Sequence, residues 1–345
     1  MRQVCRGGVL AALLGGAAAP ALADYVTVVS FGGASQEAQR AAFYEPFKQA
    51  SGEAVVHRAY NGDMDKLRRQ LEQSHVSWDV VEVEAPELKR GCAEGLFEHL
   101  EPGLAGDPAD FVPGALQPCG IGIFVWSMAL AYDPQRLDGA PAGWRDFWDV
   151  KRFPGKRGLR DGARYTLEFA LMADGVAAAD VYKVLGSAEG AERAFRKLDE
   201  LKPHIRWWKA GEEPVRALRD GSVAMSAAYN GRVSAAGGEQ PLALVWGGSI
   251  YDFDYWALPK GVWKGELARR FVAFASQAEQ QKALSERIAY GPVNRRALAL
   301  LDPRIAAGLP TAEQNIAGAV GMDSEFWSQH GPALEQRFAA WRKGS

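Results

Sequence analysis

Short apolar runs rich in β-branched residues alternate with longer amphipathic segments along the first third of the chain. Strand-like runs occupy residues 25–30, 54–57 and 78–83, and the segments between them, 36–49 and 64–73, carry apolar side chains at helical spacing. Strands that alternate with helices of about 10 to 15 residues are typical of α/β domains. The pattern therefore predicts an α/β fold with a parallel sheet in this part of the chain.

A second series of the same kind begins after Pro134 and continues to the C-terminus. The segments with helical or strand-like patterns are helices at 165–173, 188–201, 213–219, 267–275, 278–287 and 323–343, and a strand at 222–229. A chain of 345 residues is about twice the length of a typical domain. The repeated pattern in a chain of this length indicates two lobes.

Two apolar and aromatic stretches, 122–132 and 251–259, are strand-like and are candidates for segments that pass from one lobe to the other. Because two such crossings divide the chain, each lobe is expected to be discontinuous in sequence. The expected boundaries are 24–127 with 257–315 for lobe 1, and 128–256 with 316–345 for lobe 2.

The N-terminus has the three parts of a secretory signal peptide. Two arginines precede an apolar run at 7–19, and a small-x-small sequence follows at 21–23. The apolar run is too short for a membrane span, which needs roughly 20 apolar residues. Cys5 lies before the run and not at the cleavage point, so a lipid anchor is disfavoured. We expect cleavage of residues 1–23 before Asp24, with the mature chain dissolved in the periplasm of a bacterium.

Charge and cysteine content narrow the range of functions. The chain has 40 Lys and Arg against 42 Asp and Glu, so no basic excess is available to follow a nucleic-acid backbone. Removal of a signal peptide leaves Cys92 and Cys119 as the two cysteines of the mature chain. An even pair in an exported protein predicts one disulfide.

The motifs of common enzyme classes are missing. The nearest sequence to a nucleophile elbow, at 247–251, lacks its second glycine, and the five histidines show no metal-ligand spacing. The glycines at 120–122 lack the third glycine of a dinucleotide fingerprint, and no phosphate-binding loop occurs. We therefore expect no enzymatic activity, no metal and no cofactor.

Aromatic side chains and carboxylates recur together at predicted strand ends and loops, where they are typical of ligand clefts. Ring faces and counter-charges suit an ammonium ion, since each cation–π contact contributes about 0.5–2 kcal/mol. Glycines after the first strand permit close backbone approach, and an arginine after Asn230-Gly231 has the geometry to hold a carboxylate. The candidate ligand-binding residues are Phe31, Gly32, Gly33, Ser35, Glu84, Trp207, Tyr229, Arg232, Asp252, Asp254 and Tyr290, with Trp208 as the alternative to Trp207.

Five motifs occur in the order found in one known family: 29–34 with Gln36, 78–81, 229–232, 254–259 and 290–294. With the export signal, the chain resembles the polyamine-type periplasmic solute-binding proteins of ABC importers, of extracellular solute-binding protein family 1. The resemblance implies a type II periplasmic-binding-protein fold of two α/β lobes and a hinge, a monomeric receptor and an inner-membrane permease as partner. It assigns amine contacts to Tyr229, Asp254 and Tyr290.

The chain departs from this family in ways that bear on the ligand. Where polyamine binders carry first-loop aromatics this sequence has Gly32 and Ser35, and where they carry an acidic pair it has Gly162 and Tyr165. Each buried ammonium needs its own partner, so the loss of counter-charges disfavours a long polycation.

Relatives that bind γ-aminobutyrate use an arginine and an aspartate, which Arg232 and Asp254 reproduce. The ligand class stays open between a small polyamine and a zwitterionic amino acid. Two other hypotheses are an exported enzyme with Glu82 or Glu84 as general base, and a receptor of the same fold for ferric ion or an anion.

Overall fold

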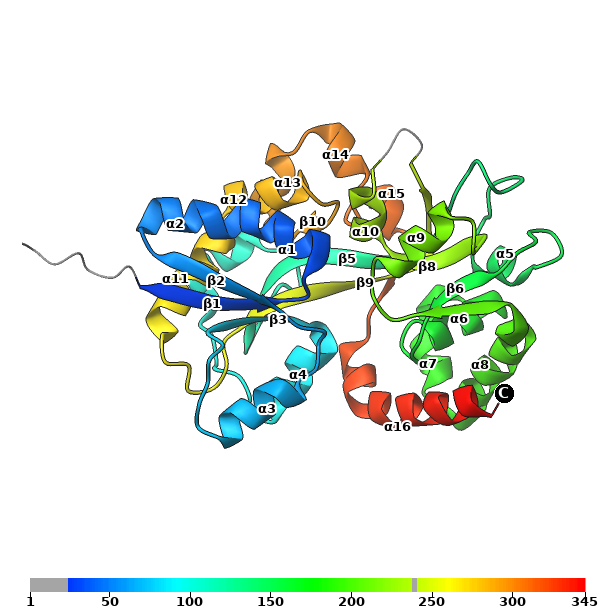
Figure 1. Cartoon of the computed structure of the whole chain (residues 1–345), viewed down its shortest axis with the longest axis horizontal. Helices are drawn as coiled ribbons and strands as arrows, with labels where there is room; N and C mark the ends of the chain where they lie inside the picture. The colour runs from blue at the N-terminus through cyan, green and yellow to red at the C-terminus, as the bar shows by residue number, and fades with distance from the viewer. Residues whose placement is uncertain (1–23, 238–240, 345) are drawn as a thin grey trace, which may run out of the picture.

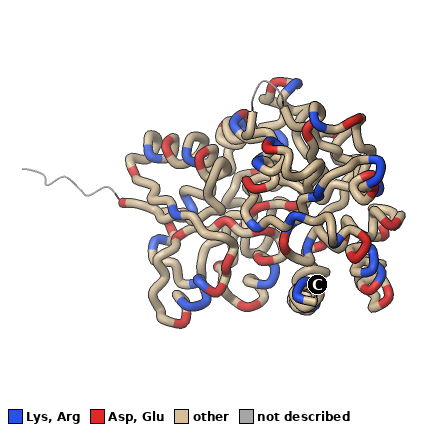
Figure 2. Tube along the Cα trace, turned by 45° about the vertical axis from the view of Figure 1, so that its right-hand side comes forward, with Lys and Arg blue, Asp and Glu red and all other residues tan. Residues whose placement is uncertain are grey.

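The computed structural model describes residues 24–237 and 241–344. The predicted signal peptide and its cleavage site involve residues 1–23, which lie outside the described part of the chain. Within the described ranges, no helix combines the length and the apolar character that a membrane crossing requires. Acidic and basic residues are interspersed along the whole trace (Figure 2), as the near balance of charges in the sequence implies.

Two groups of elements form two lobes, which lie side by side in Figure 1. The first lobe holds β1 (Tyr25–Ser30), α1 (Gly33–Gln39), α2 (Glu45–Ser51), β2 (Ala54–Ala59), α3 (Asp65–Glu72), β3 (Val80–Glu84), α4 (Ala85–Ala93), α11 (Gly265–Ala275), α12 (Ala278–Ser285) and α13 (Arg295–Leu300). The second lobe holds α5 (Trp144–Trp148), β6 (Arg157–Arg160), α6 (Thr166–Ala173), α7 (Val181–Leu185), α8 (Ala188–Leu201), β7 (Ile205–Trp208), α9 (Glu213–Arg219), β8 (Met225–Tyr229) and α16 (Ser324–Lys343).

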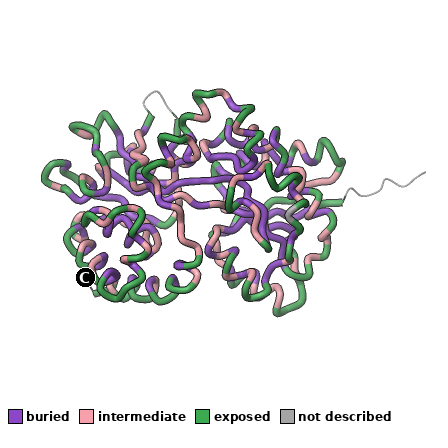
Figure 3. Tube along the Cα trace, turned by 180° about the vertical axis from the view of Figure 1, so that it is seen from behind, coloured by how far each residue is buried: buried purple, intermediate pink, exposed green. Residues whose placement is uncertain are grey.

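Two long strands, β5 (Gly120–Tyr132) and β9 (Ala243–Ala257), connect the lobes as an antiparallel pair. Every residue of β5 is buried, and Figure 3 shows a long buried trace through the middle of the molecule. The register of the two strands shifts between Gly122 and Phe124 and again between Met128 and Leu130. These irregularities bend the strands where they pass between lobes.

The sheet runs in the order β2-β1-β3-β9-β5-β8-β6-β7 and is mixed. Pairing is parallel between β1 and its neighbours β2 and β3, and between β6 and its neighbours β7 and β8. The pairs β3 with β9, β5 with β9, and β5 with β8 are antiparallel. The parallel sheet expected for the first part of the chain is present in β1, β2 and β3, whereas the crossing strands β5 and β9 run antiparallel to each other and to their neighbours β8 and β3.

Most predicted elements are present, with some changes at their ends. The helices expected at 188–201 and 213–219 are α8 and α9 with the same bounds. The helix expected at 36–49 is divided into α1, a π-helical turn at Arg40–Tyr44, and α2. The stretch expected at 251–259 begins eight residues earlier, as β9, since its N-terminal half is only partly buried and lacks a continuous apolar run. Several shorter elements, among them α4, β6 and β7, were not predicted from the sequence pattern.

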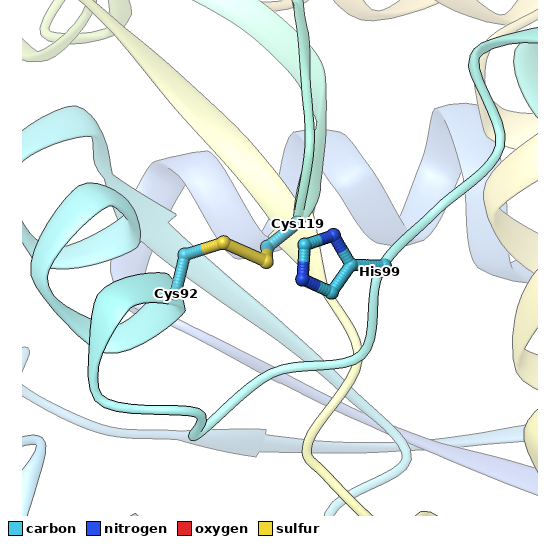
Figure 4. Close-up of side chains that lie close together, drawn as sticks. All are labelled: Cys92, His99 and Cys119. Atoms are coloured by element: carbon cyan, nitrogen blue, oxygen red, sulfur yellow. A yellow bond between two sulfur atoms is a disulfide. The ribbon is translucent and has the colours of Figure 1, made fainter.

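The predicted disulfide between Cys92 and Cys119 is present, and it ties α4 to the start of β5 within the first lobe. His99 lies beside it, as Figure 4 shows. Because the two sulfur atoms are bonded to each other, they do not offer a metal ion the thiolates that a Cys–His site requires. We interpret this cluster as a structural crosslink next to an exposed histidine.

A carboxyl group is buried between α6 and α16 in the second lobe. Glu168 is fully buried, and its Oε1 accepts a hydrogen bond of 2.7 Å from Nε1 of Trp327, whereas no residue of the described ranges forms a hydrogen bond of normal geometry with its Oε2. Burial raises the pKa of Glu168 to about 7, because desolvation penalises the charged form. The carboxyl is therefore protonated in the folded protein under conditions where the unfolded chain carries a carboxylate.

This raised pKa predicts that the substitution Glu168→Gln stabilises the protein in a pH-dependent way. Between pH 4.5 and about 7 the folded state holds a proton that the unfolded state has lost, so the wild-type free energy of unfolding falls as pH rises. Above pH 7 the Gln variant should be more stable by about 3 kcal/mol, and near pH 4.5 the two proteins should match. Urea unfolding at a series of pH values measures the difference, and a difference independent of pH would contradict the prediction.

Candidate ligand-binding site

A cavity of about 1030 Å³ lies between the two lobes. The first lobe contributes the loop after β1, residues after β2 and the end of β3, and the second contributes the ends of β6 and β8 with the loop before α9. The crossing strands β5 and β9 supply its base through Trp126 and Asp254. Ligand cavities in proteins are commonly of about 300–1,000 Å³, so the space is of the right order for a small organic molecule.

The first lobe reaches the second through the glycine loop that follows β1. Gly32 and Gly33 have φ values of 74° and 59°, which favour glycine over other residues. A Cβ atom on Gly33 would lie 2.6 Å from Nη1 of Arg232, so only glycine permits this approach. Nη2 of Arg232, from α10 (Asn230–Ala235), donates a 3.1 Å hydrogen bond to the carbonyl oxygen of Gly32. The loop therefore positions an arginine of the opposite lobe at the cavity wall.

Aromatic rings wall the cavity in pairs. Phe31 stacks on Tyr60 with ring centroids 5.2 Å apart, and Trp126 meets Tyr229 edge-on, also at 5.2 Å. Tyr290 stacks at 4.4 Å on a phenylalanine of β5 and also lines the cavity. These rings offer apolar faces to methylene groups and electron-rich faces to a cation.

A pair of neighbouring carboxyl groups forms the acidic part of the site. Asp254 accepts a 2.7 Å hydrogen bond from Nε1 of Trp126, and it interacts with the carboxyl of Glu82 behind it. Glu82 in turn accepts hydrogen bonds from Nε2 of Gln39 at 3.1 Å and from the backbone N–H of Phe31 at 3.2 Å. Burial and the nearby charge of Glu82 raise the pKa of Asp254 well above its usual range. The coupling between the two carboxyl groups therefore favours a state in which the pair retains one proton.

Glu84, a further acidic residue of the cavity, is already paired. Its Oε2 accepts a 2.7 Å bond from Nη1 of Arg164, a residue of the second lobe, and Nη2 of the same guanidinium lies 2.7 Å from Glu87. Burial raises the pKa of Glu84, and the guanidinium opposes that effect. Glu84 is therefore less available than Asp254 to a ligand cation.

Arginines also bring positive charge to the cavity, and one of them, Arg216, is exposed to solvent. Arg232 and Arg160 both line the cavity and are half-buried. Within the part of the chain that the structure describes, neither guanidinium forms a salt bridge. The Arg160 guanidinium lies 5.7 Å from the ring of Tyr165. A planar guanidinium that forms no salt bridge within the protein is suited to bind a carboxylate or another planar anion of a ligand.

Nine of the eleven ligand-binding candidates from the sequence lie at the cavity. They are Phe31, Gly32, Gly33, Ser35, Glu84, Tyr229, Arg232, Asp254 and Tyr290.

The other two candidates do not line the cavity. Trp207 points toward α16, where its ring meets Phe338 and Trp341, while the adjacent Trp208 packs behind Tyr229. Side chains alternate along β7, so only one of the two tryptophans can face the cavity side of the sheet.

Asp252 is buried in β9, and its Oδ1 accepts a bond from the backbone N–H of Phe253. Asp252 and Asp254 are two residues apart in the sequence, and only the folded structure shows that Asp254 lines the cavity and Asp252 does not.

Trp126, Tyr60 and Arg160 line the cavity but are absent from the residues chosen from the sequence. Trp126 lies within the stretch 122–132 that was expected to cross between lobes, and that expectation was the available signal. Arg160 ends β6, a four-residue strand with no clear pattern, so nothing in the sequence singled it out.

Two lobes with a cavity between them, walled by aromatic rings and lined by both acidic and basic groups, define a receptor that encloses a small charged molecule. The model of the bacterial extracellular solute-binding protein family matches residues 42–310, and this chain belongs to that family. The resemblance drawn from the sequence motifs, the two-lobed α/β fold and the solute-binding role are thereby confirmed.

Individual relatives agree with this assignment. The gamma-aminobutyric acid-binding protein of Pseudomonas aeruginosa is 56% identical over 326 residues, which cover 94% of this chain and 93% of that protein. The solved structure of MotA from A. tumefaciens B6 with glucopine has a TM-score of 0.85 at 30% identity, covering 92% of this chain and 99% of MotA. A solved GABA receptor has a TM-score of 0.83 at 30% identity, covering 92% of this chain and 98% of that receptor.

Proposed function

We propose that the protein is the periplasmic substrate-binding component of an ABC transporter, and that its ligand is γ-aminobutyrate (GABA) or a close ω-amino acid. The observation that carries the proposal is the presence of a buried carboxyl pair at Asp254 and an arginine without a salt bridge at Arg232 in one cavity. A zwitterion with separated charges can satisfy both groups at once. The 56% identity to a GABA-binding protein supports the same ligand.

The amine end of the ligand is proposed to lie against Asp254. The carboxyl group of Asp254 accepts a hydrogen bond from Nε1 of Trp126, and the rings of Trp126 and Tyr229 lie beside it. An ammonium here gains a charged hydrogen bond and cation–π contacts in a desolvated space. The ligand's methylenes would pack on the same aromatic rings.

The carboxylate end is proposed to bind Arg232. This arginine lies on the second lobe and already donates to the Gly32 carbonyl of the first lobe. A ligand that neutralises the guanidinium therefore stabilises the arrangement in which the two lobes meet. Such differential affinity for the closed state is what drives hinge closure in receptors of this kind.

The remaining roles follow from this proposal. The mature protein would begin at Asp24, act as a monomer with the lobe boundaries given above, and present its closed form to an inner-membrane permease. The ligand would be released unchanged, because transport requires binding without turnover.

A ferric-ion site is disfavoured. Burial raises the pKa of the phenol groups of Tyr229 and Tyr290 and so opposes the phenolate form that ferric iron binds.

Binding experiments on two variants test the proposal. We expect isothermal titration calorimetry to show saturable GABA binding by the wild type, with the ligand recovered intact. Arg232→Met and Asp254→Asn should each weaken GABA binding by at least about thirtyfold, because each leaves one charged end of the ligand buried without a partner. Glu212→Gln, at an exposed residue of the cavity mouth, is the matched control. Unchanged affinity in both site variants would contradict the proposed ligand orientation.

Proton release provides an independent check of the amine position. An ammonium placed beside Asp254 favours the charged carboxylate, so the shared proton should leave as the ligand binds. Calorimetry at pH 7 in phosphate and in Tris should therefore give different apparent enthalpies, with the difference reporting proton release. In Glu82→Gln the difference should shrink, since the like charge that raises the Asp254 pKa is removed. Identical enthalpies in both buffers for the wild type would place the amine elsewhere.

A further inference from the structure

We infer that Arg164 is a specificity-determining residue that acts as a built-in cation: it occupies the carboxylates that a second ligand ammonium would need, and so excludes diamines. The inference rests on the proposed function, because it concerns the class of amine that the same cavity accepts. Arg164 does not line the cavity, so it acts through Glu84, which does.

The contacts of Arg164 show how firmly it holds these carboxylates. Its guanidinium bridges Glu84 and Glu87 through bonds of 2.7 Å each, with a third contact of 3.3 Å to Glu87. The three side chains have exposed fractions of 14%, 18% and 17%, so solvent screens them little. Although burial opposes ionisation of Glu87, the guanidinium lowers the pKa of that carboxyl below its usual value. This is a largely buried ion pair, in which removal of one partner leaves an uncompensated charge.

Hydrogen bonds to the backbone around Arg164 help to fix the position of its side chain. The carboxylate of Glu335, on α16, accepts bonds from the backbone N–H groups of Ala163 at 2.9 Å and Arg164 at 3.2 Å. The next residue, Tyr165, has a φ of 71°, which is uncommon for a residue with a side chain. Strained residues of this kind are retained where the surrounding structure fixes them, frequently beside functional sites.

The charges around the pair balance without a ligand. Arg160 also faces Glu84, so two guanidiniums stand against the two carboxylates of Glu84 and Glu87. Asp252 lies near the same group, but burial raises its pKa well above the usual range and so favours its neutral form. A second ammonium that entered this side of the cavity would meet no unpaired carboxylate, and it would lose its hydration without compensation.

The experiment compares the binding of 1,4-diaminobutane to two matched variants. Arg164→Met frees both carboxylates, whereas the triple variant Arg164→Met, Glu84→Gln, Glu87→Gln removes the guanidinium and the carboxylates together. Both variants lack the contact between the lobes, so any change in closure affects them equally. We expect the single variant to bind the diamine at least about tenfold more tightly than the triple variant. This factor corresponds to the lower end of the free energy that a hydrogen bond to a charged group contributes. Arg164→Lys retains the cation and should bind the diamine as weakly as the wild type.

Equal diamine affinity in the single and triple variants would overturn the inference. Affinities are taken from calorimetry and from ligand-induced shifts of each variant's own Tm, so that a lowered basal stability does not mask binding. If Arg164→Met does not fold, Arg164→Gln and its matched triple variant replace it, because Gln keeps a hydrogen-bond donor toward Glu84. The proposed function is tested separately by GABA binding to the wild type. Failure of that binding leaves the comparison between the diamine variants intact.

Discussion

Every charge that is buried between the two lobes has to meet an opposite charge, because removal of an ion from water costs more than the protein can otherwise recover. The cavity of this solute-binding protein satisfies that requirement only in part. Arg164 pairs with Glu84 and Glu87, whereas Arg232 has no salt bridge in the described residues and the pKa of Asp254 is raised by burial and by the neighbouring charge of Glu82. We propose that the ligand completes the balance with one positive and one negative end.

The fold explains why the balance depends on both lobes. The crossing strands β5 and β9 carry Trp126 and Asp254 at the base of the cavity, so the acidic group does not depend on lobe closure. Arg232, by contrast, reaches its position against Gly32 only when the second lobe meets the first. The ion pair of Arg164 with Glu84 also joins the two lobes, on the side where α4 contacts α16. A ligand with two charged ends can therefore link a group on the crossing strands to a group on the second lobe.

The sequence predicted the architecture better than it predicted the site. The periodic spacing of apolar residues is a local signal, and it predicted the first and last residues of α8 and α9 correctly. Side-chain direction is not local: Trp207 and Trp208 are adjacent in β7, and only the packing of α16 decides which of them turns away from the cavity.

Arg164 illustrates the same limit more strongly. Its partner Glu84 is 80 residues away in the chain, and no pattern around either residue indicates that they meet. The loss of the family's acidic pair near Tyr165 was visible in the sequence. Arg164 lies between Gly162 and Tyr165, and its role is evident only from its contact across the lobes.

The most direct test of the charge balance uses the wild-type protein and ligands that lack one end of GABA. Calorimetry with GABA, butylamine and butanoate compares the zwitterion with its amine-only and acid-only analogues. The account predicts that GABA binds at least about tenfold more tightly than either analogue, since each lost charged hydrogen bond leaves a buried group unpaired. If butylamine binds as tightly as GABA, Arg232 does not receive a ligand carboxylate and the central claim is wrong.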